Sequence, residues 1–495
     1  MANLRNTTGF LLLTALILTA VSCGSSEEVR VVDTQPRSGP VADTSDSDEE
    51  TFMQLNVGLL EPIDNFDPLF INNQSSMRVL SLIYDGLFTV DTEGNPVPAL
   101  ASTYEISDDS LTYTIRINRD IFYHDSEAFL SGIGRRIQAS DIKWAFERTA
   151  RSNVPDNAAK LLMNIEGYED YFDDQRFIYD PERRVLDEVS GISVVDEQTI
   201  RFRLIEPDPD FMNKLASPYL FIYPREALQR NNRSLKSQPV GTGAYRLNEQ
   251  QDGTTVLVRA QSDTDSERVI SPRLNRINFL HSGQESNLFR QFAAEEIDWI
   301  PEMGSETRNV ALDDEDSLVP GYADQYSLHR QGTRLLYIYI NESRRSNIAW
   351  LKNRFATLEA DTLNTTGGTA TVINQPEPAE GTSIGDPDDT YYVMFTSDPH
   401  ARSLLRRVQR TLLETDSEFG LTDIQTPVSR TSVYTVSTDP FHSALFDYGT
   451  NAWLRYTVQN SGISHPKVEG LMDSEVSWKL FVEPIRVNSN SGDSE

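Results

Sequence analysis

Apolar and polar residues alternate with a period of two in several stretches of the chain, a pattern typical of strands that bury one face. Between 104 and 124 the alternation is interrupted at 108–110, and between 192 and 211 it is interrupted at 196–198, in both cases by turn-forming residues. Each interruption predicts a hairpin. Alternation and apolar content also predict strands at 54–59, 254–261, 273–282 and 333–341.

Other stretches place apolar residues three or four positions apart, which is the spacing of one face of an α-helix. They are 75–87, 139–151, 285–303 and 391–416, and a strand adjoins the helix in the last two. We expect Ser75 or Ser76 to cap the first helix and Gly86 to end it. Ser140 is expected to cap the second helix. Strands that alternate with helices predict mixed α/β lobes.

Two polar stretches predict segments without regular structure. Residues 24–51 are rich in Ser, Asp, Glu, Pro and Gly, and a segment of this composition cannot bury apolar area. We expect it to be a disordered tether with a mean reach of about 30 Å. Residues 364–389 are expected to form a long surface loop.

Residues 1–22 have the pattern of a secretory signal peptide. The apolar run at 10–21 is shorter than the ~20 residues that a membrane-spanning helix needs. Cys23, the only cysteine of the chain, follows directly. The segment resembles the lipobox of bacterial lipoproteins, in which the peptide is cut before the cysteine and the thiol carries diacylglycerol, although Ala20 stands where leucine is usual. The alternative is an ordinary signal peptide with an incidental cysteine.

The lipoprotein interpretation predicts where the protein works. Residues 23–51 would be the lipidated tether, and the folded part would be held at a membrane through Cys23. We therefore expect an exported protein, either periplasmic or on the cell surface. No cysteine remains for a disulfide, so the folded part depends on its apolar core.

The chain is strongly acidic, with 75 acidic residues, 44 basic residues and a net charge of −31. A polyanion is repelled from nucleic acid, so DNA and RNA are not expected as partners. The six histidines show no metal-ligand spacing, and neither G-x-S-x-G, H-E-x-x-H nor a convincing pair of catalytic carboxylates is present. We therefore expect no enzymatic activity and no metal or other cofactor, and a secreted hydrolase is a disfavoured alternative.

Several segments, taken in order, resemble blocks of the family 5 extracellular solute-binding proteins, the dipeptide, oligopeptide and nickel receptors of ABC importers. They are FDPLF (66–70), LIYDGLFTVDTEGNPVPALASTYEISDDSLTYTIRI (82–117), FYHDSEAF with ASDIKWAFER (122–148), PVGTGAYRL (239–247), EEIDWIP (295–301) and TRLLYIYIN (333–341). Ser126 replaces a glycine of the family pattern, and Ala244 replaces a proline. No single motif is decisive, but their order is specific.

The resemblance implies a two-lobed α/β fold of the periplasmic-binding-protein type (type II, cluster C-like) with a small extra subdomain in the first lobe. We expect the first lobe at 52–275, completed by 445–495, and a reduced second lobe at 276–444. The ligand would bind in the cleft between the lobes. The implied partners are a small solute, peptide-like or otherwise polar, and the subunits of an ABC permease. We expect the receptor to be a monomer.

The resemblance also points to a ligand site at Ile63, Asp64, Trp453, Arg455 and Tyr456. In peptide-binding members a strand ends in Trp, and an Asp three residues later pairs with the ligand's amine. Trp453 matches the Trp, but Tyr456 stands where the Asp is expected. A phenol does not replace a carboxylate as the partner of an ammonium group. Arg455 would instead favour an anionic or carbonyl-rich ligand, and Trp453 would stack on a ring.

Two alternatives stay open at this point. Trp453 could be ordinary core, with Arg455 as a solvent-facing strand residue. The C-terminal third also departs from the family pattern, because the block expected after 341 is missing and 350–360 is at most a remnant of it. The helix within 391–416 matches either of two family helices. A degenerate member that acts as a sensor or an assembly lipoprotein without transport is therefore a second hypothesis.

Overall fold

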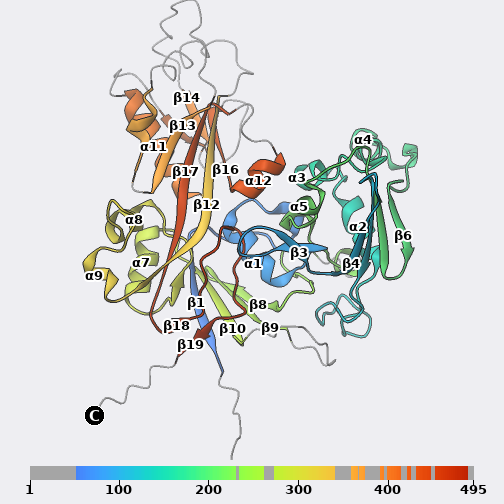
Figure 1. The fold of residues 1–495 in the computed structure, drawn as a ribbon, viewed down its shortest axis with the longest axis horizontal. Helices are drawn as coiled ribbons and strands as arrows, with labels where there is room; N and C mark the ends of the chain where they lie inside the picture. The colour runs from blue at the N-terminus through green and yellow to red at the C-terminus, as the bar shows by residue number, and fades with distance from the viewer. Residues whose placement is uncertain are drawn as a thin grey trace, which may run out of the picture. The chain divides into compact units, whose positions relative to one another are not determined.

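A large mixed β-sheet built from distant segments organises the folded part of the chain (Figure 1). The computed structural model describes residues 52–229, 234–260, 273–340, 358–365, 367–373, 391–394, 398–413, 421–424, 431–446 and 452–488. Within them the sheet has eleven strands in the order β15-β14-β16-β12-β17-β11-β1-β10-β9-β8, with β13 also paired to β17. They are β1 (Gln54–Leu59), β8 (Tyr245–Gln251), β9 (Thr254–Arg259), β10 (Arg276–His281), β11 (Trp299–Ile300), β12 (Ser327–Ile340), β13 (Gly368–Val372), β14 (Tyr391–Met394), β15 (Leu421–Ile424), β16 (Thr431–Thr438) and β17 (Leu454–Ser464).

The long strands β12 and β17 connect two parts of this sheet. They pair antiparallel from Ser327 opposite Ser464 to Ile338 opposite Leu454, and in Figure 1 they run from the side that carries β1 to the part that carries α11 (Pro399–Leu413) and β13. Their register shifts where Gly332 adopts a φ of 70°. A β-carbon at Gly332 would lie 2.6 Å from the backbone nitrogen of Ser477, so this bulge requires glycine.

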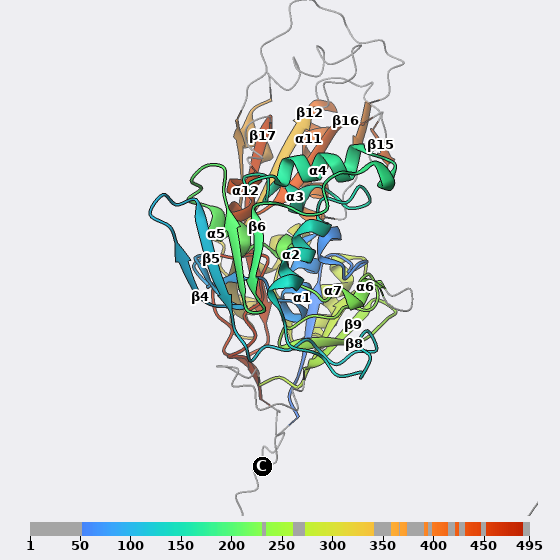
Figure 2. The same cartoon turned by 90° about the vertical axis from the view of Figure 1, so that its right-hand side faces the viewer.

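A separate four-stranded antiparallel sheet stands apart from the large one, at the right in Figure 1 and toward the viewer in Figure 2. Its order is β4-β5-β7-β6, and α2 packs on β6 and β7. Its elements are β4 (Ala101–Ile106), β5 (Thr112–Ile117), β6 (Ile192–Asp196), β7 (Thr199–Arg203) and α2 (Ala139–Arg148). The guanidinium of Arg148 donates to Asp67 Oδ1 at 2.9 Å and to the Tyr223 hydroxyl at 2.8 Å, so a buried ion pair ties this unit to the rest of the fold.

Short elements complete the described structure. The helices are η1 (Pro68–Phe70), α1 (Gln74–Ile83), α3 (Asn157–Lys160), α4 (Tyr168–Phe177), η2 (Pro181–Arg183), α5 (Phe211–Leu215), η3 (Pro218–Leu220), α6 (Glu226–Gln229), α7 (Glu285–Ala293), α8 (Ser305–Ala311), α9 (Pro320–Ala323), η4 (Ala360–Leu363) and α12 (Pro440–Phe446). The two small strand pairs are β2 (Phe88–Val90) with β3 (Pro96–Pro98) and β18 (Val468–Glu469) with β19 (Arg486–Val487). No helix within the described ranges is long and apolar enough to cross a membrane.

Apolar side chains gather in more than one core. The largest cluster joins β1 and α1 to the four-stranded sheet and α2. A second cluster lies between α11 and the strands β12, β13 and β17, and it includes Leu336, Leu404, Val408 and Trp453. β12 is buried on both faces, because Leu336 packs in this second cluster and its neighbour Tyr337 packs in another. Residues 52–495 group as one unit, so the lobe boundaries at 275 and 444 stay predictions.

Most elements predicted from the sequence are confirmed. The hairpins β4–β5 and β6–β7 form as expected, as do the strands β1, β9 and β10 and the helix α11. The expected long loop at 364–389 is wrong in part, because 368–372 forms β13, which completes a sheet edge against β17. The rest of that segment from 374 onward lies outside the described residues.

The predicted helix ends are wrong by one to three residues. α1 is capped by Asn73, whose Oδ1 accepts a hydrogen bond from the backbone of Ser76 at 2.7 Å, rather than by Ser75 or Ser76. It ends at Ile83, before Gly86. α2 begins at Ala139, and the Asp141 carboxylate accepts a hydrogen bond from the backbone of Gln138 at 3.0 Å. Ser140 therefore lies inside the helix, because the carboxylate one turn along satisfies the free backbone donor.

Candidate functional site

A cavity of ≈ 620 Å³ opens where segments of both predicted lobes meet. Its walls come from the end of β1, the connection between β10 and α7, the helix α8 and the helix α11. The lining residues are Leu59, Leu60, Pro62, His281, Ser282, Gly283, Gln284, Glu285, Ser286, Leu288, Ser305, Glu306, Asn309, Arg402, Ser403 and Arg406. Most of these side chains are polar, so the cavity suits a polar molecule. We call it the main cavity.

A narrow crevice continues the main cavity between α8, α11 and β17, and shares Ser305, Asn309 and Ser403 with it. Its volume of ≈ 10 Å³ is barely enough for one water molecule. Arg407 closes it, with its guanidinium 5.0 Å from the centre of the Tyr456 ring and its Nη1 donating to Ser403 Oγ at 3.0 Å. The crevice is therefore a packed floor beside the main cavity.

The five residues predicted to bind the ligand do not line one cavity. Ile63 and Asp64 line a separate cavity of ≈ 320 Å³, which shares Leu59, Pro62 and His281 with the main cavity. Tyr456 lines the crevice, and its hydroxyl exchanges a hydrogen bond of 2.5 Å with Thr365 Oγ1.

Trp453 and Arg455 flank the start of β17. Trp453 is 4% exposed and packs in the second apolar cluster, and Arg455 is half-buried on the strand. Neither lines any of the cavities described above. Their role in ligand binding stays a prediction, as does the lipidation of Cys23, which lies outside the described residues.

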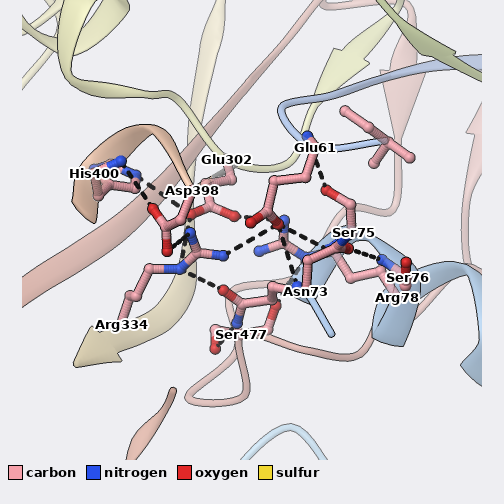
Figure 3. A network of polar contacts seen from close by, with 12 residues as sticks. Glu61, Asn73, Ser75, Ser76, Arg78, Glu302, Arg334, Asp398, His400 and Ser477 are labelled. Atoms are coloured by element: carbon pink, nitrogen blue, oxygen red, sulfur yellow. Dashed lines mark hydrogen bonds and ion pairs between the residues drawn. The ribbon is translucent and has the colours of Figure 1, made fainter. Parts of the chain in front are cut away.

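Six ionisable side chains form a buried cluster beside the main cavity (Figure 3). They are Glu61 after β1, Arg78 of α1, Glu302 after β11, Arg334 of β12, and Asp398 and His400 at the start of α11. None of them exposes more than 4% of its surface. The cluster adjoins the main cavity because Glu61 is flanked by two of its lining residues and His400 lines the crevice. We call this set the ion-pair cluster.

Arg334 stands at the centre of the ion-pair cluster. Its Nη1 lies 2.9 Å from Asp398 Oδ2, its Nε 3.3 Å from Glu302 Oε1 and its Nη2 3.6 Å from Glu61 Oε2. Arg78 pairs with the other oxygen of Glu302 at 2.7 Å. The His400 ring nitrogen Nε2 lies 3.3 Å from Glu302 Oε1. One guanidinium thus joins three carboxylates that come from three distant segments.

Two of these carboxylates also cap helices. Glu61 Oε2 accepts hydrogen bonds of 3.2 Å from the backbone nitrogens of Gln74 and Ser75 at the start of α1. Asp398 Oδ1 accepts hydrogen bonds from the first backbone nitrogens of α11, at 2.8 Å from His400 and 3.1 Å from Ala401. The positive ends of both helices therefore help to hold buried negative charge.

Burial and charge shift the pKa values of the acids in opposite directions. Burial raises the pKa of the Glu61 carboxyl, the charge of Arg334 opposes this, and the nearby carboxylates of Asp398 and Glu302 add to the rise. Burial also acts to raise the pKa of Glu302, but the charges of Arg334 and Arg78 outweigh it and hold that pKa well below its usual range. Glu302 is therefore a fixed negative centre of the cluster, and Glu61 holds a proton more readily than Glu302 does.

Sequence reasoning missed the ion-pair cluster and the arginines of the main cavity. Each member looks like an ordinary surface charge in its own segment, and only the sheet topology brings residues 61, 302 and 398 together. The one local signal was Asp398 directly before Pro399, which is a typical helix start. Among the described residues no group of three or more His, Cys, Asp or Glu side chains is arranged to hold a metal ion.

Comparison with known proteins identifies the family. Residues 95–357, more than half of the chain, match the family described as "Bacterial extracellular solute-binding proteins, family 5 Middle". The chain belongs to this family. The family predicted from the sequence is thus confirmed.

Curated relatives match over part of their length. A "Probable ABC transporter periplasmic-binding protein SapA" of Escherichia coli is 28% identical over 235 residues, which is 46% of this chain and 39% of the relative. A "Glutathione-binding protein GsiB" of Pectobacterium atrosepticum is 28% identical over 183 residues, or 37% of this chain and 29% of the relative. The aligned region thus spans about a third of the length of these relatives.

Solved structures confirm the predicted fold class, the two-lobed α/β fold of periplasmic binding proteins. "Listeria monocytogenes OppA bound to peptide" is similar with a TM-score of 0.66 at 14% identity, covering 89% of this chain and 100% of that chain. The Escherichia coli murein tripeptide binding protein MppA gives a TM-score of 0.67 at 14% identity, over 88% of this chain and 99% of that chain. At this level of identity the likeness concerns the fold alone.

Proposed function

We propose that the chain is the substrate-binding component of an ABC importer, which captures a small peptide-like or other polar solute in the main cavity and delivers it to a permease. The observation that carries the proposal is a polar cavity of ≈ 620 Å³ with walls from both predicted lobes, in a member of a solute-binding family. Cavities of about 300 to 1,000 Å³ are typical of small-ligand sites. A di- or tripeptide fits this size.

The names of the relatives favour peptides among the polar solutes. They include a peptide transport periplasmic protein of Salmonella typhimurium, glutathione-binding proteins and a di/tripeptide-binding protein of Pseudomonas aeruginosa. The mixed lining supports the same class, because Ser282, Gln284 and Asn309 offer hydrogen bonds while Leu59 and Leu288 offer apolar contact. Closure of one lobe on the other would supply the remaining contacts.

The experiment is thermal unfolding of the full-length chain with a panel of solutes. The panel contains di- and tripeptides, glutathione, sugars, polyamines and small organic acids. A solute that binds the folded chain stabilises it by about 2.7 kcal/mol at a concentration of 100 times its Kd. We expect at least one peptide or organic acid to raise the melting temperature, with no effect on an unrelated exported protein. If no member of the panel stabilises the chain, the proposal fails and the degenerate-member hypothesis gains.

We further propose that Cys23 anchors this receptor to a membrane through lipid. The support is the lipobox-like sequence before it and the absence of any other cysteine. Labelling of expressing cells with radioactive palmitate should mark the wild-type chain and leave the C23S variant unlabelled. The variant should also leave the membrane fraction. Equal labelling of both chains would contradict the anchor without affecting the proposed solute site.

A further inference from the structure

The main cavity has one wall that carries two arginines on a single helix face. Arg402 and Arg406 of α11 are four residues apart, and both line the cavity. Side chains at this spacing point to the same side of a helix, with their β-carbons about 5–6 Å apart. Two guanidiniums so placed can reach one carboxylate or two neighbouring anionic oxygens.

The arginines of the neighbouring crevice are engaged inside the protein. Arg308 Nη2 pairs with Asp316 Oδ1 at 2.8 Å, and its Nη1 donates to the backbone oxygen of Gln459 at 2.6 Å. Arg407 donates to Ser403 Oγ and lies over the Tyr456 ring. Both guanidiniums thus have fixed structural partners, and we assign them to the floor of the site.

Arg406 differs from them. It is exposed on the cavity side of α11, and no hydrogen bond or ion pair joins it to any other described residue. Asn309, on the neighbouring helix α8, also lines the cavity with a side-chain amide that is not used within the described part of the chain. α8 and α11 pack against each other, and because Asn309 and Arg406 both line the main cavity, these groups face one space.

The acids of the cavity lie on the other helices. Glu285 of α7 is occupied, because its carboxylate accepts hydrogen bonds from the backbone nitrogens of Glu306 at 3.2 Å and Thr307 at 2.6 Å. The side chain of Glu306 in α8 is exposed. The cavity is therefore polarised, with positive charge on the α11 wall and one solvated carboxylate on α8.

We propose that Arg402 and Arg406 bind a carboxylate of the transported solute, with Asn309 as an additional hydrogen-bond donor. This inference rests on the proposed function and narrows the range of solutes, because the two arginines would select solutes that carry a carboxylate. The crevice supports the assignment, because none of its described lining residues is an acid that could bind an amine. Tyr456 stands there instead, and its hydroxyl is hydrogen-bonded to Thr365. Since the Glu285 carboxylate is occupied by backbone donors, Glu306 is the acid of the cavity wall that is left for an amine, and we assign a free amine to a secondary contact.

The test is isothermal titration calorimetry on the full-length chain with matched probes. The probes are N-acetylated di-, tri- and tetraalanine, each as the free acid and as the C-terminal amide, together with succinate and its diamide. Acetylation removes the amine, so each pair differs only in its anionic groups. A charge-assisted contact to a carboxylate is expected to make at least one acid bind about tenfold to a hundredfold tighter than its amide.

Variants of α11 provide the matched control. R402Q and R406Q should each weaken binding of the acid about tenfold or more and remove its advantage over the amide. R410Q changes the same charge on the same helix, but Arg410 does not line the cavity, so its affinity should equal that of the wild type. Urea unfolding of all three variants shows whether the fold is kept.

Each other outcome overturns the inference. If an amide binds as tightly as its acid, or if R410Q weakens binding as much as R406Q, then Arg402 and Arg406 do not recognise the carboxylate of the solute. The proposed receptor function is not affected by either result. The same holds if only sugars or polyamines from the broad solute panel bind. If no solute of either panel binds, both the inference and the proposed function fail.

Discussion

The protein uses arginine in two contrasting ways within neighbouring parts of its structure. In the ion-pair cluster, Arg78 and Arg334 are 1% exposed and every strong contact is to a carboxylate or carbonyl of the chain itself. In the main cavity, Arg406 is exposed and makes no such contact with described residues. A guanidinium taken out of water must be paired internally, whereas one at a hollow surface stays available to an external anion.

The comparison also shows why the two regions can coexist. α11 contributes to both, with Asp398 and His400 in the cluster and Arg402 and Arg406 in the cavity wall. The buried pairs fix the start of this helix to β11 and β12. Arg402 and Arg406, one and two turns later, are thereby held at defined positions, which lowers the entropic cost of binding a ligand.

The largest expected effect comes from breaking the ion-pair cluster. R334M removes the centre of the cluster and leaves Glu61, Glu302 and Asp398 without their shared partner. Removal of one partner from a buried ion pair typically costs about 3–5 kcal/mol. Urea unfolding should show a loss of this size. R330M is the control, because Arg330 lies on the same strand but is exposed, and a similar loss in both variants would contradict a special role for Arg334.

The second prediction concerns the proton on Glu61. Its pKa is raised above the ordinary value of 4.5 in the folded chain. As the pH rises above 4.5 the unfolded chain loses this proton first, so the wild type loses stability until the pH passes the folded-state pKa, by up to about 1.4 kcal/mol per pH unit. E61Q cannot titrate, so it should gain stability relative to the wild type across the same window.

Glu302 gives the opposite dependence and serves as the comparison. Its lowered pKa contributes stability that is fully present above 4.5 and is lost as the pH falls below that value. Urea unfolding of the wild type and E61Q between pH 4 and pH 8 would separate the two effects. A constant difference between the two chains across this range would contradict the raised pKa of Glu61.

A smaller effect is expected at Tyr456. Y456F removes the hydrogen bond to Thr365 and should cost about 1 kcal/mol of stability. T365V should cost a similar amount, and the double variant should cost less than the sum of the two because both changes break one contact. Affinity for an acidic solute should not change in Y456F. A strong loss of affinity would instead place Tyr456 among the ligand contacts.

The smallest expected effect on stability is that of R406Q. Substitution of an exposed side chain without internal partners usually changes the unfolding free energy by less than about 0.5 kcal/mol. The melting temperature of this variant without ligand should equal that of the wild type. A clear destabilisation would show that Arg406 supports the fold and would weaken the contrast with Arg334.

The sequence predicted local structure better than the site. The hairpins β4–β5 and β6–β7 could be predicted because the alternation of apolar and polar residues and the turn-forming residues are adjacent in the sequence. The cap of α1 was missed because Asn73 is one of several polar residues in a row. β12 begins earlier than predicted, since its first residues are polar and a bulge at Gly332 interrupts the pattern.

The site depends on information that no local pattern contains. The family resemblance gave positions such as Trp453 and Tyr456, but it could not give the direction of a side chain, and both prove to be buried. The main cavity draws residues from segments as distant as Leu59 and Arg406. Such contacts follow from the order of strands in the sheet, which the sequence pattern leaves open.

The most direct test combines affinity and stability in one variant, R406Q. An acidic solute found to bind the wild type would be titrated into this variant by calorimetry, and the unfolding free energy of the same preparation would be measured in urea. We predict an affinity loss of at least about tenfold with stability close to that of the wild type. Unchanged affinity, or a loss of affinity that only accompanies a loss of stability, would contradict the role of Arg406 in ligand binding.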